Sequence, residues 1–279
     1  MKSHLSYKMY PRRVTQLAAG VLGLALAVSA QIQVSVSPPS LPWTSNTWVN
    51  VVVSNVTVGA EVDLRLYVDV DGDGALSGVD QLVASFRVQD GVTNSLGSSL
   101  IVDDMDHATN GIIASRIAYF HQEGMESPIH IVGNYLWAAS PVVGDTATAR
   151  FAVTQPTSTV WVTGSVIDYV TSNAIPGAIV ELATAVDVGN LASWTDTNGE
   201  FMIYVPTGLS TADVDGVTAG GVGYITSDDP VTGGSIAEYS FSADLNDGNN
   251  PLSTTLRLVP VFSNQVFSVS GYLLSLIHI

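Results

Sequence analysis

The sequence has no cysteine and almost no basic residues outside its N-terminal segment. Without Cys among its 279 residues, the chain has no disulfide framework and no thiol nucleophile. Both lysines, Lys2 and Lys8, lie in the first 30 residues, so the rest of the chain cannot form a phosphate-binding glycine loop with its lysine. The sequence also has no Gly-x-Ser-x-Gly elbow, the turn that carries a serine nucleophile in many hydrolases. These absences favour a non-catalytic protein.

Positive charge is scarce in the chain as a whole. Four of the nine Lys and Arg residues lie in the first 30, which leaves five against 25 Asp and Glu residues, a formal net charge of −20. A surface this acidic repels nucleic-acid phosphates and anionic membranes and attracts cations. We therefore expect no nucleic-acid partner. Calcium binding and a high-salt habitat would each account for the excess of acidic residues.

Residues 1–30 are typical of a secretory signal peptide. Basic residues precede an apolar run from Leu17 to Val28, and the run ends in the small residues Ser29 and Ala30. The run is shorter than the roughly 20 residues of a membrane-spanning helix, which argues against an uncleaved anchor. We expect export, cleavage near Gln31, a secreted or cell-surface location and no membrane insertion after cleavage.

The remaining sequence predicts an all-β protein with two tandem β-sandwich modules. A chain with 46% hydrophobic and 12% charged residues is too apolar for disorder. Over residues 31–155, alternating runs such as Trp48–Val53 and Val62–Val68 are separated by turn-forming clusters, as in a sandwich. Pro and hydroxylated residues at 154–159 predict a short linker, and a second module follows at 156–262.

Two family resemblances accompany this pattern. Val36–Pro39 followed by Trp48–Asn55 resembles bacterial immunoglobulin-like adhesion modules. Val162–Asp168, Ile175–Leu182 and Thr195–Ile203 resemble, in order and spacing, the carboxypeptidase regulatory-like family. That second resemblance implies a seven-stranded prealbumin-like sandwich. It also implies a non-catalytic module, attached to peptidases, receptors or large surface proteins as a folding aid or binding platform.

The turn residues of the second module support its predicted strands. Pro176-Gly177 predicts a turn with positive φ at the glycine. Asp196 and Gly199 predict a hairpin that is closed by an Asx-type turn. Ala178–Leu182 and Phe201–Val205 are the strands expected beside these turns.

Residues 263–279 are interpreted as the start of a truncated further module with an artefactual tail. Val266–Leu273 repeats the pattern of Val160–Val166, with Gly271 in the place of Gly164. The last residues, 274–279, resemble a translated sequencing adapter. We therefore expect the natural reading frame to continue past Gly271.

The strongest candidate site is the stretch from Asp69 to Asp80, which has the spacing of a twelve-residue calcium loop. Ca2+ takes about six to eight oxygen ligands, and carboxylates at the first, third and fifth loop positions point inward together. Gly74 at the sixth position permits the sharp turn. The predicted ligands are Asp69, Asp71, Asp73, the carbonyl of Ala75, Ser77 directly or through water, and Asp80.

The loop departs from the EF-hand pattern in two positions. Asp80 replaces the longer bidentate Glu, and Gln81 follows where an apolar residue is usual, so we expect weaker affinity than in a cytosolic sensor. The flanks, Val62–Val68 and Leu82–Val88, alternate with period two and predict strands. The loop therefore resembles the strand-loop calcium sites of bacterial surface proteins. The alternative is an Asp- and Gly-rich hairpin turn with solvated carboxylates.

Three further groups of polar residues are weaker candidates for cation sites. For two acidic clusters a solvated loop is favoured over a second cation site, and a histidine- and glutamate-containing run lacks the helical spacing of zinc motifs. The acidic clusters are Asp103, Asp104, Asp106 and His107, and Asp244, Asn246, Asp247, Gly248 and Asn249; the third group is His121, Glu123, Glu126 and His130.

Aromatic residues provide candidates for a carbohydrate platform, although sandwich cores use the same residue types. The candidates are Trp43, Trp48, Tyr135, Trp137, Trp161 and Trp194.

The sequence thus predicts an exported, non-catalytic structural or adhesive surface module that Ca2+ stabilises, with carbohydrate or other surface proteins as partners. The alternative is the non-catalytic N-terminal accessory region of a secreted peptidase or glycosidase whose catalytic domain is missing from this sequence. Paired carboxylates for glycoside hydrolysis are disfavoured, because no other feature supports them.

Overall fold

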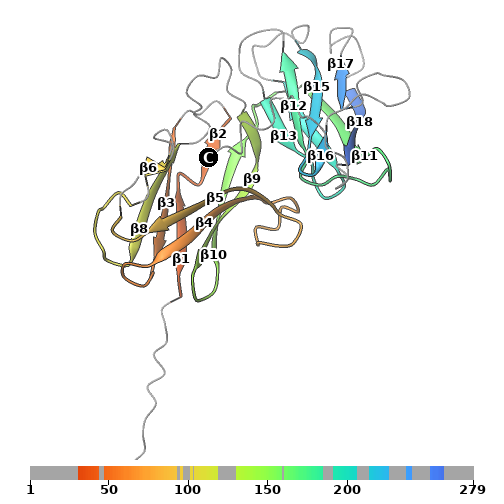
Figure 1. Cartoon of the computed structure of the whole chain (residues 1–279). Coiled ribbons are helices and arrows are strands. Elements are labelled where there is room, and N and C mark those ends of the chain that lie inside the picture. The colour runs from red at the N-terminus through yellow and green to blue at the C-terminus, as the bar shows by residue number, and fades with distance from the viewer. Residues whose placement is uncertain are drawn as a thin grey trace, which may run out of the picture. The chain divides into compact units, whose positions relative to one another are not determined.

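The computed structural model describes residues 31–43, 47–92, 95–96, 101–102, 104–118, 130–158, 160–184, 191–205, 214–225, 237–240 and 252–260. Over these ranges every regular element is a β-strand, which confirms the predicted all-β class (Figure 1). No helix in this part of the chain is long and apolar enough to cross a membrane. The predicted signal peptide at 1–30 and the tail at 263–279 lie outside the described residues.

One antiparallel sheet contains five strands from the first predicted module. Its order is β1-β3-β8-β7-β6. The hydrophobic side chains of its second strand alternate inward, with Val49, Val51 and Val53 fully buried, as expected for a sheet with one face on a core. The strands are β1 (Gln33–Ser37), β3 (Trp48–Ser54), β6 (Ser95–Leu96), β7 (Ile101–Val102) and β8 (Ile112–Ala118).

A nine-stranded sheet supplies the other side of this core. In its first-module part, β4 pairs with β5 and β9, and β9 pairs with β10. Val62, Leu64, Leu66 and Val68 on β4 are buried, and the residues between them are only partly covered. The first-module strands of this sheet are β2 (Ser40–Pro42), β4 (Glu61–Val68), β5 (Gln81–Gln89), β9 (His130–Pro141) and β10 (Ala147–Thr154).

The second predicted module contributes eight described strands, where the family resemblance implied seven. Four form a separate sheet in the order β14-β11-β18-β16, and four continue the nine-stranded sheet in the order β17-β15-β12-β13. Val162, Val180 and Leu258 are among its fully buried residues. The strands are β11 (Trp161–Asp168), β12 (Ile179–Thr184), β13 (Leu191–Trp194), β14 (Glu200–Tyr204), β15 (Val214–Gly220), β16 (Tyr224–Ile225), β17 (Glu238–Ser240) and β18 (Leu252–Pro260).

Both turns predicted for the second module are confirmed. Gly177 has a φ of 65°, in the left-handed region that glycine adopts without strain. Oδ1 of Asp196 accepts hydrogen bonds from the N–H groups of Asn198 (2.8 Å) and Glu200 (2.9 Å). This Asx-type turn closes the hairpin that leads into β14.

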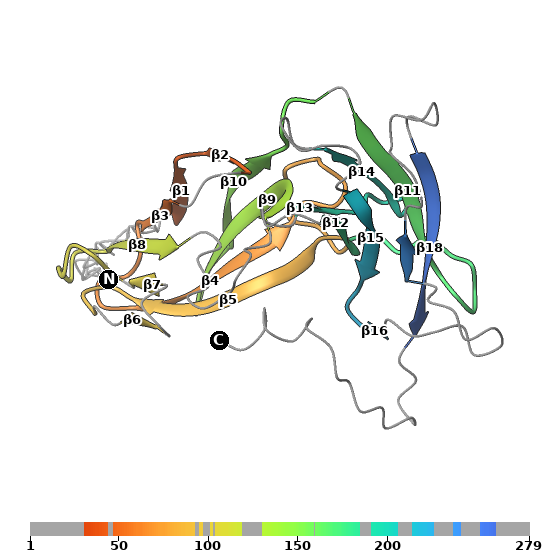
Figure 2. The ribbon, with the colours of Figure 1, turned by 90° about the horizontal axis from the view of Figure 1, so that it is seen from above.

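A parallel pairing of β9 with β13 joins the two halves of the nine-stranded sheet. Leu191 pairs with His130, and Ser193 pairs with Val132. Figure 2 shows the two strands side by side, with β4, β5 and β10 near β9 and with β12 and β15 near β13. Residues from both predicted modules therefore share one sheet.

Candidate metal centre

The predicted calcium loop connects β4 to β5 and is anchored at its first residue. The backbone N–H of Asp69 donates to the carbonyl of Asn134 on β9 at 3.0 Å. Gly72 and Gly74 have φ values of 70° and 72°, which other residues adopt only with strain. The two glycines permit the tight backbone of the loop, in which the carboxylates of Asp71 and Asp73 come close to that of Asp69.

Three of the predicted ligands converge. Asp69, Asp71 and Asp73 each offer a carboxylate oxygen, and these oxygens lie within 4.8 Å of one another. Asp69 is only 8% exposed, whereas Asp71 and Asp73 are exposed. No other group of three His, Cys, Asp or Glu residues in the described ranges comes together in this way. The cluster thus has one buried carboxylate and two solvent-facing ones.

The buried carboxylate has one oxygen without a partner. Oδ2 of Asp69 accepts the N–H of Gly74 at 3.0 Å, but Oδ1 is buried and makes no hydrogen bond. An unpaired buried acceptor costs about 1–3 kcal/mol, and more when it is charged. A bound cation would remove this cost, because it supplies the missing partner for Oδ1.

The electrostatic state of Asp69 agrees with this geometry. Burial raises the pKa of Asp69 and outweighs the hydrogen bond from Gly74, which lowers it. The negative charges of Asp80 and Asp71 raise it further. Each of these carboxylates therefore disfavours ionisation of Asp69, and a divalent cation among them would favour it.

The remaining predicted ligands hold the loop closed. The carboxylate of Asp80 accepts the N–H of Val70 at 3.1 Å through Oδ1 and the N–H of Ser77 at 2.6 Å through Oδ2. Oγ of Ser77 donates to Asp71 at 3.5 Å, and the N–H of Ala75 donates to Asp73 at 2.7 Å. Asp80 is not part of the group of three carboxylates. It joins the two ends of the loop.

Such a set of donors suits calcium. All the converging ligand atoms are carboxylate oxygens, which hard cations prefer. Each carboxylate oxygen that accepts one N–H keeps a second lone pair for a metal ion. The loop also has the open, water-accessible side that the exposed Asp71 and Asp73 provide, where water can complete the coordination.

Arg150 is a contributor that the sequence pattern did not indicate. It lies on β10, and its guanidinium donates to the backbone carbonyls of Asp73 and, at 3.4 Å, Gly74. These contacts hold the fifth and sixth loop positions from outside. The one sequence signal for Arg150 is that basic residues are scarce: it is one of five outside the first 30 residues.

Gln81 is a second residue with a role that the sequence left unexplained. Its side-chain amide donates to the carbonyl of Pro176 at 2.8 Å, in the turn that precedes β12. An apolar residue at this position would lose that bond. The departure from the EF-hand pattern at Gln81 therefore has a structural reason.

Of the second acidic cluster, Asp104 corrects the expectation of a solvated loop. Asp104 is fully buried, and its carboxylate accepts the N–H groups of Gly91 (2.8 Å) and Ala114 (3.1 Å). Asp106 accepts the N–H of Ala108 at 2.8 Å. Asp104 thus joins the turn after β5 to β8, and Asp106 caps a backbone group of the loop between them, which sequence spacing does not reveal. Asp103 and the cluster at Asp244–Asn249 lie outside the described residues.

The predicted aromatic platform is not assembled from exposed side chains. Tyr135 and Trp137 are buried in the core, at 1% and 3% exposure, and Trp43, Trp48, Trp161 and Trp194 are half-buried. Of the histidine- and glutamate-containing group, His130 begins β9. His121, Glu123 and Glu126 fall outside the ranges that the structure describes.

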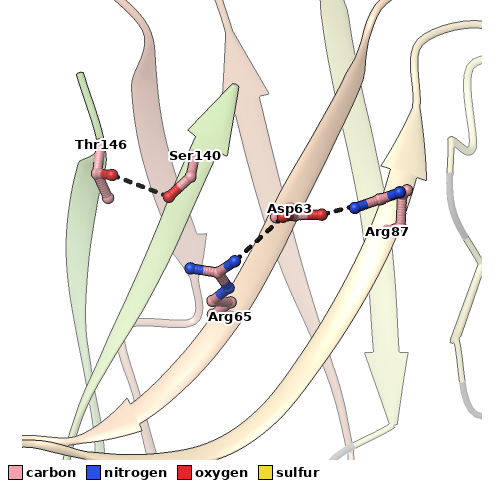
Figure 3. Close-up of polar contacts among 5 residues, drawn as sticks. All are labelled: Asp63, Arg65, Arg87, Ser140 and Thr146. Atoms are coloured by element: carbon pink, nitrogen blue, oxygen red, sulfur yellow. Dashed lines mark hydrogen bonds and ion pairs between the residues drawn. The ribbon is translucent and has the colours of Figure 1, made fainter. Parts of the chain in front are cut away.

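A polar network covers part of the β4–β5 surface (Figure 3). Asp63 on β4 forms ion pairs with Arg65 at 3.1 Å and with Arg87 on β5 at 3.0 Å, and Ser140 on β9 hydrogen-bonds Thr146. Water and salt screen ion pairs that are this exposed. The network therefore keeps this face polar and adds little to stability.

Comparison with known proteins found solved structures similar to this chain. No family model matches it, and no curated protein matches it in sequence. It is similar to BcpA, the major pilin subunit of Bacillus cereus, at 13% identity over 83% of this chain and 70% of that one, with a TM-score of 0.22. The shaft pilin spaA from Lactobacillus rhamnosus GG has 12% identity over 83% of this chain and 98% of that one, with a TM-score of 0.22.

A β-glucosidase from Erythrobacter marinus is similar at 11% identity over 44% of this chain and 15% of that one, with a TM-score of 0.23. TM-scores this low assign neither a fold family nor a function to the chain. The resemblances to the immunoglobulin-like and carboxypeptidase regulatory-like families stay predictions from the sequence.

Proposed function

We propose that this chain is an exported, non-catalytic scaffold whose loop Asp69–Asp80 binds Ca2+ and is stabilised by it. The ligands are Asp69, Asp71 and Asp73, with Asp80, the carbonyl of Ala75 and Ser77 or a water completing the shell. Export rests on the signal-peptide pattern of residues 1–30, and the absence of catalytic motifs in the sequence supports a non-catalytic role.

One observation carries the calcium proposal. Oδ1 of Asp69 is a buried carboxylate oxygen without a hydrogen-bond donor, and it belongs to a residue that lies among two further carboxylates. A hairpin turn with merely solvated carboxylates has no reason to bury one of them unpaired, because that costs stability. A cation-binding loop accepts this cost in the empty state and recovers it on binding.

The stabilisation can be estimated from mass action. A ligand that binds only the folded state at 100 times its dissociation constant stabilises that state by about 2.7 kcal/mol. Mg2+ demands a near-ideal octahedral shell and loses its waters reluctantly, so it should stabilise the protein much less.

The test uses the compact unit from Gln31 to Ile279. Calorimetric titration and thermal melts are measured with Ca2+, with Mg2+ and with chelator. Asp71→Asn removes one ligand charge, and Asp145→Asn removes an equally exposed charge from the β9–β10 connection as the control. We expect a calcium-dependent rise in Tm that Asp71→Asn reduces and Asp145→Asn retains. The same Tm in Ca2+ and chelator would show the proposal to be wrong.

A surface or adhesive protein and the accessory region of a secreted hydrolase would both use a calcium-stabilised scaffold. That scaffold role is the one proposed here. Carbohydrate or other surface proteins are the proposed partners. The half-buried pair Trp161 and Tyr204, with ring centroids 6.0 Å apart, is the place on β11 and β14 at which to test carbohydrate contact. Loss of glycan binding in Trp161→Ala would support it, and unchanged binding would not.

A further inference from the structure

Both ends of the calcium loop are attached to the place where the two predicted modules meet. At its start, the N–H of Asp69 bonds to the carbonyl of Asn134 on β9. Directly after its end, the side chain of Gln81 bonds to the carbonyl of Pro176 in the second module. The loop is therefore attached at its start to β9 and, directly after its end, to the turn that precedes β12.

The strand β9 is itself the main connection across this junction. Its first residues pair with β13, and the indole N–H of Trp194 on β13 donates to the hydroxyl of Tyr135 at 2.9 Å. The Trp194 ring packs so closely on Gly133 that an added Cβ would lie 2.9 Å from it. Asn134, whose carbonyl accepts the hydrogen bond from Asp69, lies in the sequence between Gly133 and Tyr135, the two residues that Trp194 contacts.

The predicted linker also makes defined contacts with the second module. The side-chain amide of Gln155 donates to the carbonyl of Met202 at 2.8 Å, and its oxygen accepts the N–H of Tyr204 at 2.9 Å. The modules are thus connected along β9–β13, at Gln155 and at Gln81. Of these connections, that of Gln81 lies directly beside a predicted ligand, Asp80.

We propose that Ca2+ binding at Asp69–Asp80 stiffens the junction between residues 31–155 and residues 156–262, with Gln81 as the residue that transmits the effect. This inference rests on the proposed function. The pairing of Val68 with Gln81 and the hydrogen bond from the N–H of Val70 to Asp80 already hold the two ends of the loop together, but without the cation the carboxylates of the loop repel one another. A cation that ligates Asp69 and Asp80 removes this repulsion and adds a link between the two ends, so Gln81, which follows Asp80, moves less relative to Asp69, which β9 holds.

The mechanical consequence follows from the number of attachment points. The pairing along β9–β13 and the hydrogen bonds of Gln155 are two attachments between the modules. A third attachment, from Gln81 to the Pro176-Gly177 turn, opposes rotation of one module against the other. Gly177 is suited to the contact, since a Cβ there would lie 2.5 Å from the Gln81 side chain. Calcium would therefore stiffen the junction between the modules without altering either sandwich.

The experiment measures the junction and calcium binding separately. Because the chain has no cysteine, Thr148→Cys on β10 and Ser253→Cys on β18, both exposed, give a single pair of spin labels. The distribution of distances between the labels is measured with Ca2+ and with chelator, and hydrogen exchange of Leu191–Trp194 is followed in the unlabelled chain. Binding at one site usually changes an equilibrium at a coupled site by about 5- to 150-fold. Hydrogen exchange in β13 should therefore slow by at least about 5-fold when Ca2+ binds.

Gln81→Ala is the test variant, and Gln89→Ala is its matched control. Both glutamines lie on β5 and donate to a backbone carbonyl, but Gln89 bonds within the first module, to Gly59 at 3.0 Å. We expect Gln81→Ala to bind Ca2+ with unchanged affinity. The variant should lose both the calcium-dependent narrowing of the label–label distance distribution and the calcium-dependent slowing of hydrogen exchange in β13. Gln89→Ala should keep both effects.

The outcomes separate this inference from the proposed function. If calorimetry detects no Ca2+ binding, the proposed function fails and the inference fails with it. If Ca2+ binds but leaves the distances and the exchange of β13 unchanged, the inference alone is wrong. If Gln81→Ala responds to Ca2+ as the unsubstituted chain does, the stiffening does not pass through Gln81 and the proposal is overturned.

Discussion

The guanidinium of Arg150 on β10 occupies the space that any side chain at Gly74 would need. A Cβ at Gly74 would lie 1.7 Å from Nε of Arg150, and Gly74 also has a positive φ of 72°. Glycine at the sixth position of the loop is therefore favoured for two separate reasons, its positive φ and the space that the side chain of Arg150 takes up.

These two reasons can be measured separately at Gly74 and Gly72. Gly72 has nearly the same φ, 70°, but nothing lies within 4 Å of a Cβ there. Gly72→Ala should thus cost only the left-handed strain of about 1–2 kcal/mol. Gly74→Ala should cost more in urea unfolding, since it must also displace Arg150. In an Arg150→Ala background the cost of Gly74→Ala should fall to that of Gly72→Ala; an undiminished cost would contradict the packing explanation.

Asp69→Asn should have opposite effects with and without calcium. In chelator, the neutral amide removes a buried, repelled charge while its carbonyl can still accept the N–H of Gly74, so we expect Tm to rise or stay equal. In Ca2+ the variant should lose the ligand-dependent gain. Thermal melts under both conditions measure this crossover. A variant that is destabilised equally in both would indicate a purely structural role for Asp69.

Asp90 should make the stability of the fold depend on pH. Its carboxylate, 2% exposed, accepts the N–H groups of Gly59 (2.7 Å), Gly111 (3.0 Å) and Asn110 (3.2 Å). Burial by itself raises the pKa of Asp90, but the backbone hydrogen bonds together lower it below the ordinary value.

A group whose pKa is lower in the folded state stabilises the fold above the unfolded pKa, here about 3.9. That contribution is lost as the pH falls through the folded pKa. Asp90→Asn should therefore be less stable than the unsubstituted chain at pH 7, and the difference should shrink below about pH 4. Urea unfolding at several pH values measures it. A difference that does not change with pH would exclude the ionised carboxylate as the cause.

Thr195 should be needed for its hydroxyl. It is 1% exposed, accepts the N–H of Ala178 at 2.9 Å and donates to the carbonyl of Ile175 at 2.7 Å. Thr195→Val leaves both backbone groups unpaired and should lower the free energy of unfolding by about 1–3 kcal/mol for each. Thr195→Ser keeps the hydroxyl and should lose only about 1 kcal/mol, the contribution of one buried methyl group. Equal losses in the two variants would assign the effect to packing.

The sequence by itself determined the features that depend on neighbouring residues. Alternation of apolar and polar side chains predicted β4 and β5 on either side of the loop, because a strand places successive side chains on opposite faces. Turn chemistry predicted the positive φ of Gly177 and the Asx-type turn at Asp196. The spacing of Asp69, Asp71 and Asp73 predicted that their carboxylates lie close together, and their oxygens are within 4.8 Å of one another.

Only the tertiary structure decided what surrounds these features. The burial and unpaired oxygen of Asp69, the contact of Arg150 with Asp73 across 77 residues, and the bond from Gln81 to Pro176 across 95 residues all depend on strands distant in the sequence. Pattern and spacing describe a residue by its neighbours along the chain, whereas burial and long-range hydrogen bonds are set by which strands pair and pack. For that reason the sequence indicated a cation loop, and the fold revealed its connection to the second module.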